Sequence, residues 1–374
     1  MRIAIDIRPL LEPQRTGVPL YTLHLIRRLI ERGAHQYALF CNSSRLPFPV
    51  DIPLSDNSTT HHFFRRSNRL LNLSIFLTGR PKLEEMVGEF DLAYLPDLNF
   101  LATHQPYTLT VHDLSFIRRP EFFSCKHRLR NRLTGLRRVL NQAALVIAAS
   151  NHTKEDLVEV FNLDEALIQV VNPGVDTNFY HPLAIAETAD IRKKYGLSEQ
   201  FVLFLATLEP RKNVIGIIQA FDRADTGETE LVLAGGRGWL YNQIFKTAKM
   251  SHKRDKIKFL GYIDENDKPA LYSAATTFVY PSFYEGFGMP VLEALACGTP
   301  VIASSTTSLP EVVGEAGLLV NPDRTEEITW AINTILNDAE LERHLRQAGP
   351  TRASQFTWDL SADRLEHAFA EIKK

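Results

Sequence analysis

The sequence has few cysteines, no long hydrophobic run and almost no net charge. Its three cysteines, Cys41, Cys125 and Cys297, are far apart and form no C-x-x-C pair, which argues against a disulfide framework and against a zinc site. No apolar run approaches the roughly 18 residues of a membrane-spanning helix. The net charge of −2 argues against a nucleic-acid partner, because a nucleic-acid-binding protein of this length would be far more basic.

The length and the first residues limit the class of protein further. A chain of 374 residues is too long for one hydrophobic core and predicts two domains. Its content of 44% hydrophobic and 23% charged residues is close to the globular average, which excludes a disordered protein. Residues 1–6 read as a buried strand and not as a signal peptide, so we expect a cytoplasmic protein.

Apolar runs alternate with amphipathic stretches of helical length along the whole chain, which predicts an α/β fold with parallel sheets. Strands are expected at residues 2–7, 37–41, 92–95, 108–111, 145–148, 201–206, 230–234, 256–260, 277–280, 301–303 and 318–320. Helices are expected at residues 21–31, 126–141, 153–161, 214–221 and 290–297. We predict two doubly wound, Rossmann-like domains that face each other across a cleft, where the carboxyl ends of the strands bind ligands.

A segment rich in turn formers separates the two halves. Residues 172–182 include Pro173, Gly174 and Pro182, and the prolines cannot continue a helix. We therefore predict an N-terminal domain over residues 1–171, a linker over residues 172–182 and a C-terminal domain over residues 183–355. Residues 356–374 are expected to form a last helix that crosses back to the N-terminal domain.

The most specific motif is a glycine turn that follows a strand and opens a helix. Gly286 and Gly288 let the backbone approach a ligand, and Pro290 marks the start of the helix. The amides and the positive end of the helix attract phosphate oxygens or sugar hydroxyls. Glu285 and Glu293 flank this turn, and each carboxylate can accept hydrogen bonds from a vicinal diol.

Two further groups of polar residues follow predicted strands. Arg211 and Lys212 come after the strand at residues 201–206, where two adjacent cations suit a diphosphate. His112 comes directly after the strand at residues 108–111. Taken alone, such residues are more often a solvated turn and a structural histidine.

The segment around Glu285 and Glu293 resembles the E-x7-E signature of the large GT4 family of retaining glycosyltransferases, whose fold is called GT-B. The resemblance implies that Glu285 meets hydroxyls of the donor sugar and that Glu293 holds the nucleotide ribose. It also implies that the backbone of the turn, at Gly286, Phe287, Gly288 and Met289, faces the sugar and the distal phosphate.

The same family resemblance extends to other segments. Arg211 and Lys212 lie in a segment similar to the family's E-P-x-K motif, whose cations neutralise the leaving pyrophosphate. His112 resembles the family histidine that approaches the reacting sugar carbon. Weaker similarities place Gly17 near the donor phosphates or the acceptor, and Gly261, Tyr262 and Ile263 beside the nucleotide base. At Gly17 this chain departs from the family's richer glycine loop.

The resemblance implies an enzyme in which the N-terminal domain binds the acceptor and the C-terminal domain binds the nucleotide sugar. The sequence contains no Asp-x-Asp, so we expect no metal and no cofactor besides the nucleotide-sugar substrate. Transfer is then expected to retain the anomeric configuration, with the leaving phosphate taking the proton of the acceptor in a front-face attack.

The motif forms look most like those of bacterial mannosyltransferases, which favours transfer of mannose from GDP-mannose to a glycan or lipid-linked acceptor in surface polysaccharide synthesis. A UDP-sugar donor, a UDP-sugar 2-epimerase of the same architecture and an inactive nucleotide-sugar-binding subunit stay open as alternatives. A dehydrogenase is disfavoured, because Tyr241 stands where G-x-G-x-x-G needs its last glycine.

Residues from Arg118 to Arg138 include eight lysines or arginines against the single acidic residue Glu121. Such a run is either a solvated basic helix face or a peripheral contact with the inner face of a membrane beside a lipid-linked acceptor.

Overall fold

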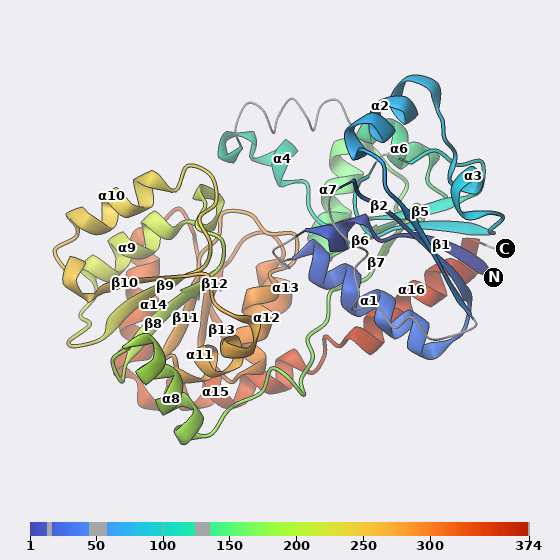
Figure 1. Ribbon diagram of the computed structural model, residues 1–374. Helices are drawn as coiled ribbons and strands as arrows, with labels where there is room; N and C mark the ends of the chain where they lie inside the picture. The colour runs from blue at the N-terminus through green and yellow to red at the C-terminus, as the bar shows by residue number, and fades with distance from the viewer. Residues whose placement is uncertain (13–16, 45–57, 100, 124–134, 373–374) are drawn as a thin grey trace. The chain divides into compact units, whose positions relative to one another are not determined.

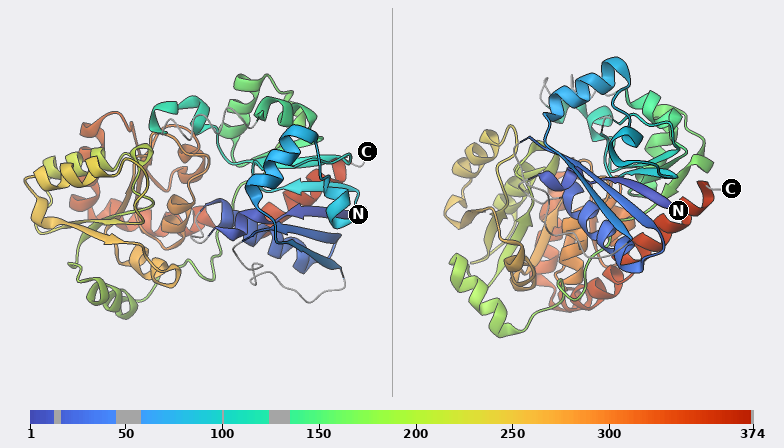
Figure 2. Two further views of the ribbon diagram at one scale, coloured as in Figure 1. Left: turned by 45° about the horizontal axis from the view of Figure 1, so that its top comes forward. Right: turned by 45° about the vertical axis from the view of Figure 1, so that its right-hand side comes forward.

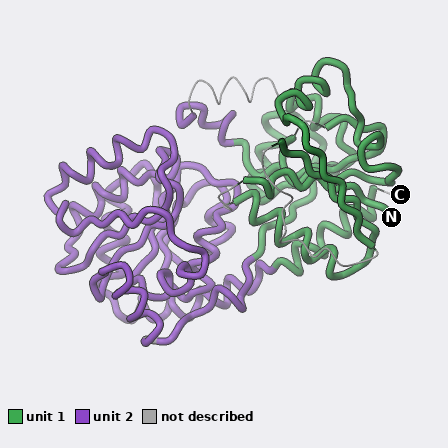
Figure 3. The backbone as a smooth tube through the Cα atoms, viewed as in Figure 1, with its two compact units in different colours: residues 1–114, 125–174, 358–374 green, residues 115–124, 175–357 purple. Residues whose placement is uncertain are grey.

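The structure is a computed structural model that describes residues 1–12, 17–44, 58–99, 101–123 and 135–372. It divides into two units, shown in Figure 3. Unit 1 comprises residues 1–114, 125–174 and 358–374, and unit 2 comprises residues 115–124 and 175–357. The main division falls between Gly174 and Val175, within the segment that the sequence marks as a linker.

Unit 1 is built on a parallel sheet of seven strands in the order β3-β2-β1-β4-β5-β6-β7. The strands are β1 (Arg2–Asp6), β2 (Gln36–Asn42), β3 (Thr59–Phe64), β4 (Leu92–Leu95), β5 (Tyr107–Val111), β6 (Leu145–Ala148) and β7 (Ile168–Val170). The helices are α1 (Val18–Arg32), α2 (Asn68–Thr78), α3 (Leu83–Val87), α6 (Leu136–Gln142), α7 (Asn151–Phe161) and α16 (Trp358–Ile372), with 3-10 turns at Arg8–Leu11 and Glu165–Leu167 (Figure 1).

Unit 2 is built on a parallel sheet of six strands in the order β10-β9-β8-β11-β12-β13. The strands are β8 (Phe201–Leu205), β9 (Glu230–Ala234), β10 (Ile257–Gly261), β11 (Thr277–Tyr280), β12 (Val301–Ser304) and β13 (Gly317–Val320). The helices are α4 (Ser115–Arg118), α8 (Ile185–Tyr195), α9 (Val214–Arg223), α10 (Asn242–Met250), α11 (Lys268–Ala274), α12 (Met289–Ala296), α13 (Leu309–Val313), α14 (Thr325–Asn337) and α15 (Ala339–Ala353). The 3-10 turns lie at Pro120–Phe122, Pro210–Lys212, Arg254–Lys256 and Glu265–Asp267.

Both sheets start in the middle, grow to one edge and then return to grow toward the other, which is the doubly wound Rossmann pattern. The predicted α/β class with two Rossmann-like domains is therefore confirmed. The strands that the apolar runs predict are present, but β3 and β7 were missed. In β3 the sequence Thr-Thr-His-His-Phe-Phe shows no apolar alternation, because β3 is an edge strand whose side chains are mostly half-exposed.

The central strands of unit 2 are buried on both faces, as helix-covered parallel strands require. Helix α9 shows how the covering works. Its residues Val214, Ile217, Ile218 and Phe221 are buried in the core of this unit. Each such side chain contributes about 1.5–3 kcal/mol through the removal of apolar surface from water.

Helix α16 packs against α1 in unit 1, although the two lie at opposite ends of the chain (Figure 1). The ring of Trp358 stacks on that of His24 with 5.0 Å between the centroids. Arg32 on α1 pairs with Asp363 and Glu366 on α16 at 2.5 and 3.2 Å. Helix α16 therefore belongs to unit 1, although residues 175–357 before it belong to unit 2.

Residues 115–124 belong to unit 2, whereas the sequence analysis placed them in the N-terminal domain. Phe122 stacks on Phe283 with 5.3 Å between the centroids, and Phe123 stacks on Trp239 at 5.7 Å. The indole nitrogen of Trp239 also donates to the carbonyl oxygen of Phe122 at 2.5 Å.

Among the described helices, none is long and apolar enough to cross a membrane.

Candidate functional site

The candidate site of unit 2 lies where the strand order of its sheet reverses. Strands β8 and β11 are neighbours in the sheet, but their crossover connections run toward opposite edges. Loops that leave the carboxyl ends of two such strands diverge and leave room for a ligand. Arg211 and Lys212 follow β8, and Glu285 follows β11, so both predicted motifs lie at this point.

The loop after β8 is held in place by the loop after β9. The amide of Leu208 donates to the carbonyl of Gly236 at 2.9 Å, and the amide of Gly238 donates back to Leu208 at 3.1 Å. Gly235 has φ 131°, and a Cβ atom there would lie 1.9 Å from the carbonyl oxygen of Ala206. The glycines after β9 are therefore explained by the close approach of two loops.

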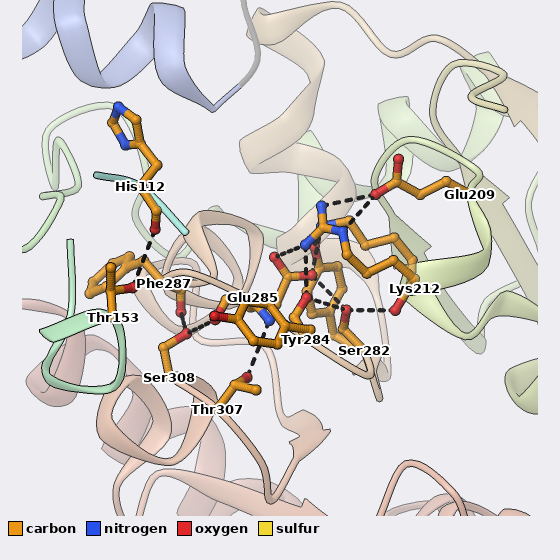
Figure 4. A network of polar contacts seen from close by, with 12 residues as sticks. His112, Thr153, Glu209, Lys212, Ser282, Tyr284, Glu285, Phe287, Thr307 and Ser308 are labelled. Carbon is orange, nitrogen blue, oxygen red and sulfur yellow. Dashed lines mark hydrogen bonds and ion pairs between the residues drawn. The ribbon is translucent and has the colours of Figure 1, made fainter. Parts of the chain in front are cut away.

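Glu285 is 6% exposed and lies among hydrogen-bond donors from both loops (Figure 4). Its Oε1 atom lies 2.6 Å from Lys212 Nζ and 2.6 Å from Ser282 Oγ, and its Oε2 atom accepts from Arg211 Nη1 at 3.2 Å. Burial acts to raise the pKa of Glu285, but the charges of Lys212 and Arg211 outweigh it and lower that pKa to about 2. The carboxylate is therefore ionised at neutral pH.

Both cations of the site are fixed by groups of unit 2. Arg211 contacts Glu209 Oε1 through Nη2 at 2.9 Å and donates to the carbonyl oxygen of Tyr284 at 2.7 Å. Lys212 donates to the hydroxyl of Tyr280 at 2.6 Å. Arg211 and Lys212 therefore meet two carboxylates, and the cluster holds its donors in fixed directions without a large excess of positive charge.

Hydrogen bonds with the residues that precede α13 hold the glycine turn in place. Ser308 Oγ lies 2.9 Å from the carbonyl oxygen of Glu285 and 3.0 Å from that of Phe287. The amide of Glu285 donates to Thr307 Oγ1 at 3.2 Å (Figure 4). Gly288 has φ 108°, a region that favours glycine, and caps the start of α12.

The turn thus places the start of α12 beside Glu285. Met289 is the first residue of this helix, Pro290 has no N–H group, and the amides of Val291 and Leu292 donate to the carbonyl oxygen of Gly288 at 3.0 and 3.2 Å. Within the helix start, the amide of Met289 is therefore the one that can face a ligand. The predicted residues Gly286, Phe287, Gly288 and Met289 therefore form one turn with Glu285. A polyol or a phosphate fits such a group of donors and acceptors.

Glu293 lies one helical turn or more into α12 in a different environment. It is 6% exposed, and its Oε2 atom accepts from the hydroxyl of Tyr272 at 2.9 Å. Burial raises the pKa of Glu293, and Lys268 opposes that shift only in part. The two glutamates of the motif thus have pKa values displaced in opposite directions.

Gly261 ends β10, the edge strand two positions from β8, and Tyr262 and Ile263 follow it. The carbonyl oxygen of Gly261 accepts from the amide of Gly235 at 2.7 Å, which ties this end to the loop after β9. Ile263 is buried in the core, and Tyr262 is exposed. These three residues therefore border the loop bracing Arg211, and the structure gives them no contact with Glu285 within the described residues.

The two predicted site residues of unit 1 lie near each other. His112 directly follows β5, and its Nε2 atom lies 2.7 Å from the carbonyl oxygen of Pro96. A carbonyl oxygen only accepts hydrogen bonds, so Nε2 of His112 is the donor in this contact. The imidazole also meets the ring of Tyr21 edge to face at 4.9 Å, and Tyr21 lies in the first turn of α1, which Gly17 caps.

Much of the basic run from Arg118 to Arg138 lies outside the described residues, which omit 124–134. In the described part, the guanidinium of Arg119 lies 5.2 Å from the ring centre of Phe122 and 5.7 Å from that of Phe283. Phe283 is two residues from Glu285. Arg119 and Phe122 therefore contact the loop that carries Glu285, a role that the sequence does not predict for this segment.

The side chains of the site that were not expected from the sequence include Glu209, Tyr280, Ser282, Thr307 and Ser308. Among them, only Glu209 could have been recognised in the sequence, because it is the first residue of the E-P-x-K segment. Among the described residues, no group of three or more His, Cys, Asp or Glu side chains is arranged to hold a metal ion.

Two family models match the chain. Residues 15–179 match the family described as Glycosyltransferase Family 4, and residues 187–352 match the one described as glycosyl transferases group 1. The O-antigen chain mannosyltransferase B of Escherichia coli is 34% identical over 96% of this chain and 97% of its own length. The serotype-specific mannosyltransferase WbdA of Escherichia coli is 28% identical over 62% of this chain and 29% of its own length.

Solved structures resemble the whole chain. Anabaena HepE in complex with UDP and glucose has a TM-score of 0.76 at 21% identity, covering 99% of this chain and 100% of its own. The sucrose-phosphate synthase from Thermosynechococcus elongatus has a TM-score of 0.76 at 22% identity, covering 99% and 98%. At these identities the likeness concerns the fold, and it confirms the predicted GT-B class.

Proposed function

This chain belongs to the GT4 family of glycosyltransferases, and we propose that it transfers mannose from GDP-mannose to a hydroxyl of a glycan or lipid-linked acceptor in surface polysaccharide synthesis. The observation that carries the proposal is the position of Glu285 between Lys212 and Arg211 at the switch point of unit 2. The names of the mannosyltransferase relatives support the choice of sugar.

The proposed reaction relies on Arg211 and Lys212 to stabilise the negative charge on the departing nucleoside diphosphate. Within the described residues Lys212 Nζ has two acceptors, Tyr280 and Glu285, so its third hydrogen is left for a ligand. Donors that are already aligned need no reorganisation as charge develops, which is the main source of electrostatic catalysis. The amide of Met289 and the positive end of the α12 dipole add to this stabilisation.

Glu285 is proposed to orient the donor sugar by accepting hydrogen bonds from its hydroxyls. Its low pKa keeps it an acceptor at every physiological pH. Glu293 is proposed to hold the ribose, and Gly261 to Ile263 to border the base. His112 is proposed to face the reacting carbon from unit 1.

We further propose that transfer retains the anomeric configuration and needs neither a metal nor a cofactor. Among the described residues, Glu209 and Glu285 form ion pairs with Arg211 and Lys212. In the proposed reaction these two cations, and not a metal ion, neutralise the charge of the nucleoside diphosphate. The departing phosphate oxygen then takes the proton of the acceptor hydroxyl, while the new glycosidic bond forms on the same face of the sugar.

The test is a thermal-shift screen of GDP-, UDP- and ADP-sugars, followed by a transfer assay with the sugar that binds. A ligand that binds the native state raises its melting temperature. GDP-mannose should give the largest shift, and the shift should fall in Glu285→Gln. A larger shift with a UDP-sugar overturns the donor assignment, free UDP-sugar isomers without acceptor indicate an epimerase, and binding without turnover indicates an inactive subunit.

A further inference from the structure

Thr307, in the loop between β12 and α13, has a left-handed backbone with φ 60°. Among the described residues other than glycine, a positive φ is shared by Asn162, Asn213 and Leu240. Asparagine tolerates this region, because its short polar side chain can form local hydrogen bonds. A β-branched threonine does not, since its Cβ atom crowds the following carbonyl oxygen. The backbone of Thr307 is therefore strained, and such strain clusters at functional sites.

Hydrogen bonds to the sheet hold the loop that leads to Thr307. The amide of Ser305 donates to the carbonyl oxygen of Val320 on β13 at 2.8 Å. Ser304, which ends β12 and is fully buried, accepts from the amide of Thr306 through Oγ at 3.2 Å. The same Oγ atom lies 2.8 Å from Thr306 Oγ1. The loop is thus fixed before the chain reaches Thr307, which allows a strained conformation to persist there.

This loop contacts the glycine turn that carries Glu285. Strand β12 is the sheet neighbour of β11, and Figure 2 shows this part of unit 2, in orange, from two further sides. The amide of Glu285 donates to Thr307 Oγ1 at 3.2 Å, and Ser308 Oγ lies 2.9 Å from the carbonyl oxygen of Glu285 (Figure 4). Both polar groups of the Glu285 backbone are therefore bound to one fixed loop.

The far end of the turn is held by packing. A Cβ atom at Gly288 would collide with Cδ2 of Leu309, the fully buried first residue of α13. Ser308 Oγ also lies 3.0 Å from the carbonyl oxygen of Phe287. The loop that contains Thr307 thus supports the turn at both of its ends.

We propose that Thr307 is a positioning residue for the glycine turn, with a strained backbone that aims Oγ1 at the amide of Glu285. The proposal rests on the proposed function, in which Glu285 orients the donor sugar. The side chain of Glu285 reaches Lys212 and Arg211 from this backbone, so a shift of the turn carries the carboxylate with it. A misplacement of about 1 Å can slow an enzyme reaction about 100-fold.

Stability gives no reason for a threonine at this position. Glycine adopts φ 60° without strain, but it has no hydroxyl group. Threonine supplies the hydroxyl that the amide of Glu285 uses and strains the backbone in return. The residue present is therefore the one that serves the turn and not the one that suits the loop.

Three substitutions separate the hydroxyl from the strain. Thr307→Ser keeps the hydroxyl, Thr307→Val keeps the shape and the strain without the hydroxyl, and Thr307→Gly removes both. The matched control is Leu240→Gly in the loop between β9 and α10, because Leu240 has φ 58° and a side chain that is 60% exposed. The control relieves strain of the same kind at a residue outside the site.

The value of kcat/KM for the donor should follow the hydroxyl. We expect it to stay close to the wild-type value in Thr307→Ser and Leu240→Gly, and to fall about tenfold in Thr307→Val and Thr307→Gly, the effect of one hydrogen bond. The melting temperature should follow the strain instead, so Thr307→Gly should melt at a higher temperature than Thr307→Val. A purely structural threonine predicts that the more stable of these two variants is also the more active.

Amide hydrogen exchange of residues 281–290, read by mass spectrometry, tests the same contact without a substrate. Exchange should be faster in Thr307→Val and Thr307→Gly than in the wild type, Thr307→Ser and Leu240→Gly. A chain that shows this difference but transfers no sugar supports the positioning of the turn and contradicts the proposed function. Wild-type exchange in Thr307→Val, or wild-type kcat/KM in Thr307→Gly, overturns the role of Thr307.

Discussion

Lys212 Nζ lies 2.6 Å from Glu285 Oε1, and both side chains are almost fully buried. The two residues follow the neighbouring strands β8 and β11, so their ion pair joins the loops on either side of the switch point. A buried ion pair gains little stability over a well-packed apolar pair, because desolvation offsets most of its attraction. Its position is therefore better explained by the alignment of donors than by the stability of the fold.

Replacing Lys212 should separate these two roles. Lys212→Ala removes a donor to the departing diphosphate, so we expect kcat to fall by about 100-fold or more. It also leaves Glu285 buried with only Arg211 as its cation, which should lower the free energy of unfolding by about 3 kcal/mol. Steady-state transfer kinetics and urea unfolding measure the two effects.

The double variant Lys212→Met, Glu285→Gln is the control for that experiment. It removes both buried charges together, so most of the lost stability should return while transfer stays low. If the double variant regained transfer along with stability, the alignment of charge at this pair would not serve catalysis.

The stability of the protein should depend on Glu285 in acid. Its pKa is about 2 in the folded protein and 4.5 in an ordinary environment, so the unfolded chain binds the proton first as the pH falls. The stabilisation is complete above about pH 4.5 and is lost as the pH falls toward 2, with a total of about 3 kcal/mol. The difference in unfolding free energy between the wild type and Glu285→Gln should shrink over this interval. A difference that stays constant between pH 6 and 3 would contradict the assignment.

Glu293 should behave in the opposite way. Burial raises its pKa, so the stability that it contributes is complete below its ordinary pKa and is lost as the pH rises through the folded value. Glu293→Gln mimics the protonated form and should be at least as stable as the wild type at neutral pH. If Glu293 holds the ribose, Glu293→Gln should bind GDP-mannose more weakly than the wild type does. Calorimetry measures this difference. A variant with lower stability and unchanged binding would assign Glu293 a structural role.

The residues of this site that the sequence predicted share one property. Arg211, Lys212 and Glu285 lie in the loops that follow apolar runs, and parallel strands bring their carboxyl ends to one edge of a sheet. That is why motifs more than 70 residues apart could be expected in one place. The helix start after Gly288 could also be predicted, because Pro290 stands in the first turn of α12 and proline favours that position.

Other parts of the site could not be predicted for physical reasons. Ser282 and Ser308 act through single hydroxyl groups, which suit a surface turn equally well. The stacking of Phe122 on Phe283 joins residues from distant parts of the chain, and no local pattern encodes it. The opposite pKa shifts of Glu285 and Glu293 depend on neighbours, such as Lys268, that the sequence places outside the motif.

Chelation tests the proposal that transfer needs no metal. Extensive dialysis against EDTA should leave the initial rate of transfer unchanged, because Arg211 and Lys212 neutralise the diphosphate in the proposed reaction. Addition of magnesium or manganese to the dialysed protein should give no increase. A transfer rate that falls with EDTA and returns with either ion would show that a metal ion neutralises the diphosphate instead.

Gly235 offers a test of how the loop that carries Arg211 is supported. A Cβ atom at this position would lie 1.9 Å from the carbonyl oxygen of Ala206, in the chain leading to Arg211. Gly33 also has a positive φ, but a Cβ atom there meets nothing within 4 Å. Gly33→Ala should therefore cost about 1 kcal/mol from backbone strain alone. Gly235→Ala should cost at least about 2 kcal/mol more, because backbone atoms must move apart.

That movement should displace the donors along with the loop, so Gly235→Ala is expected to lower kcat as well as stability, while Gly33→Ala lowers only stability. Measurements on folded protein, well below the melting temperature of each variant, keep the two effects apart. Equal kcat in both variants would show that the bracing between the loops after β8 and β9 does not set the position of Arg211 and Lys212.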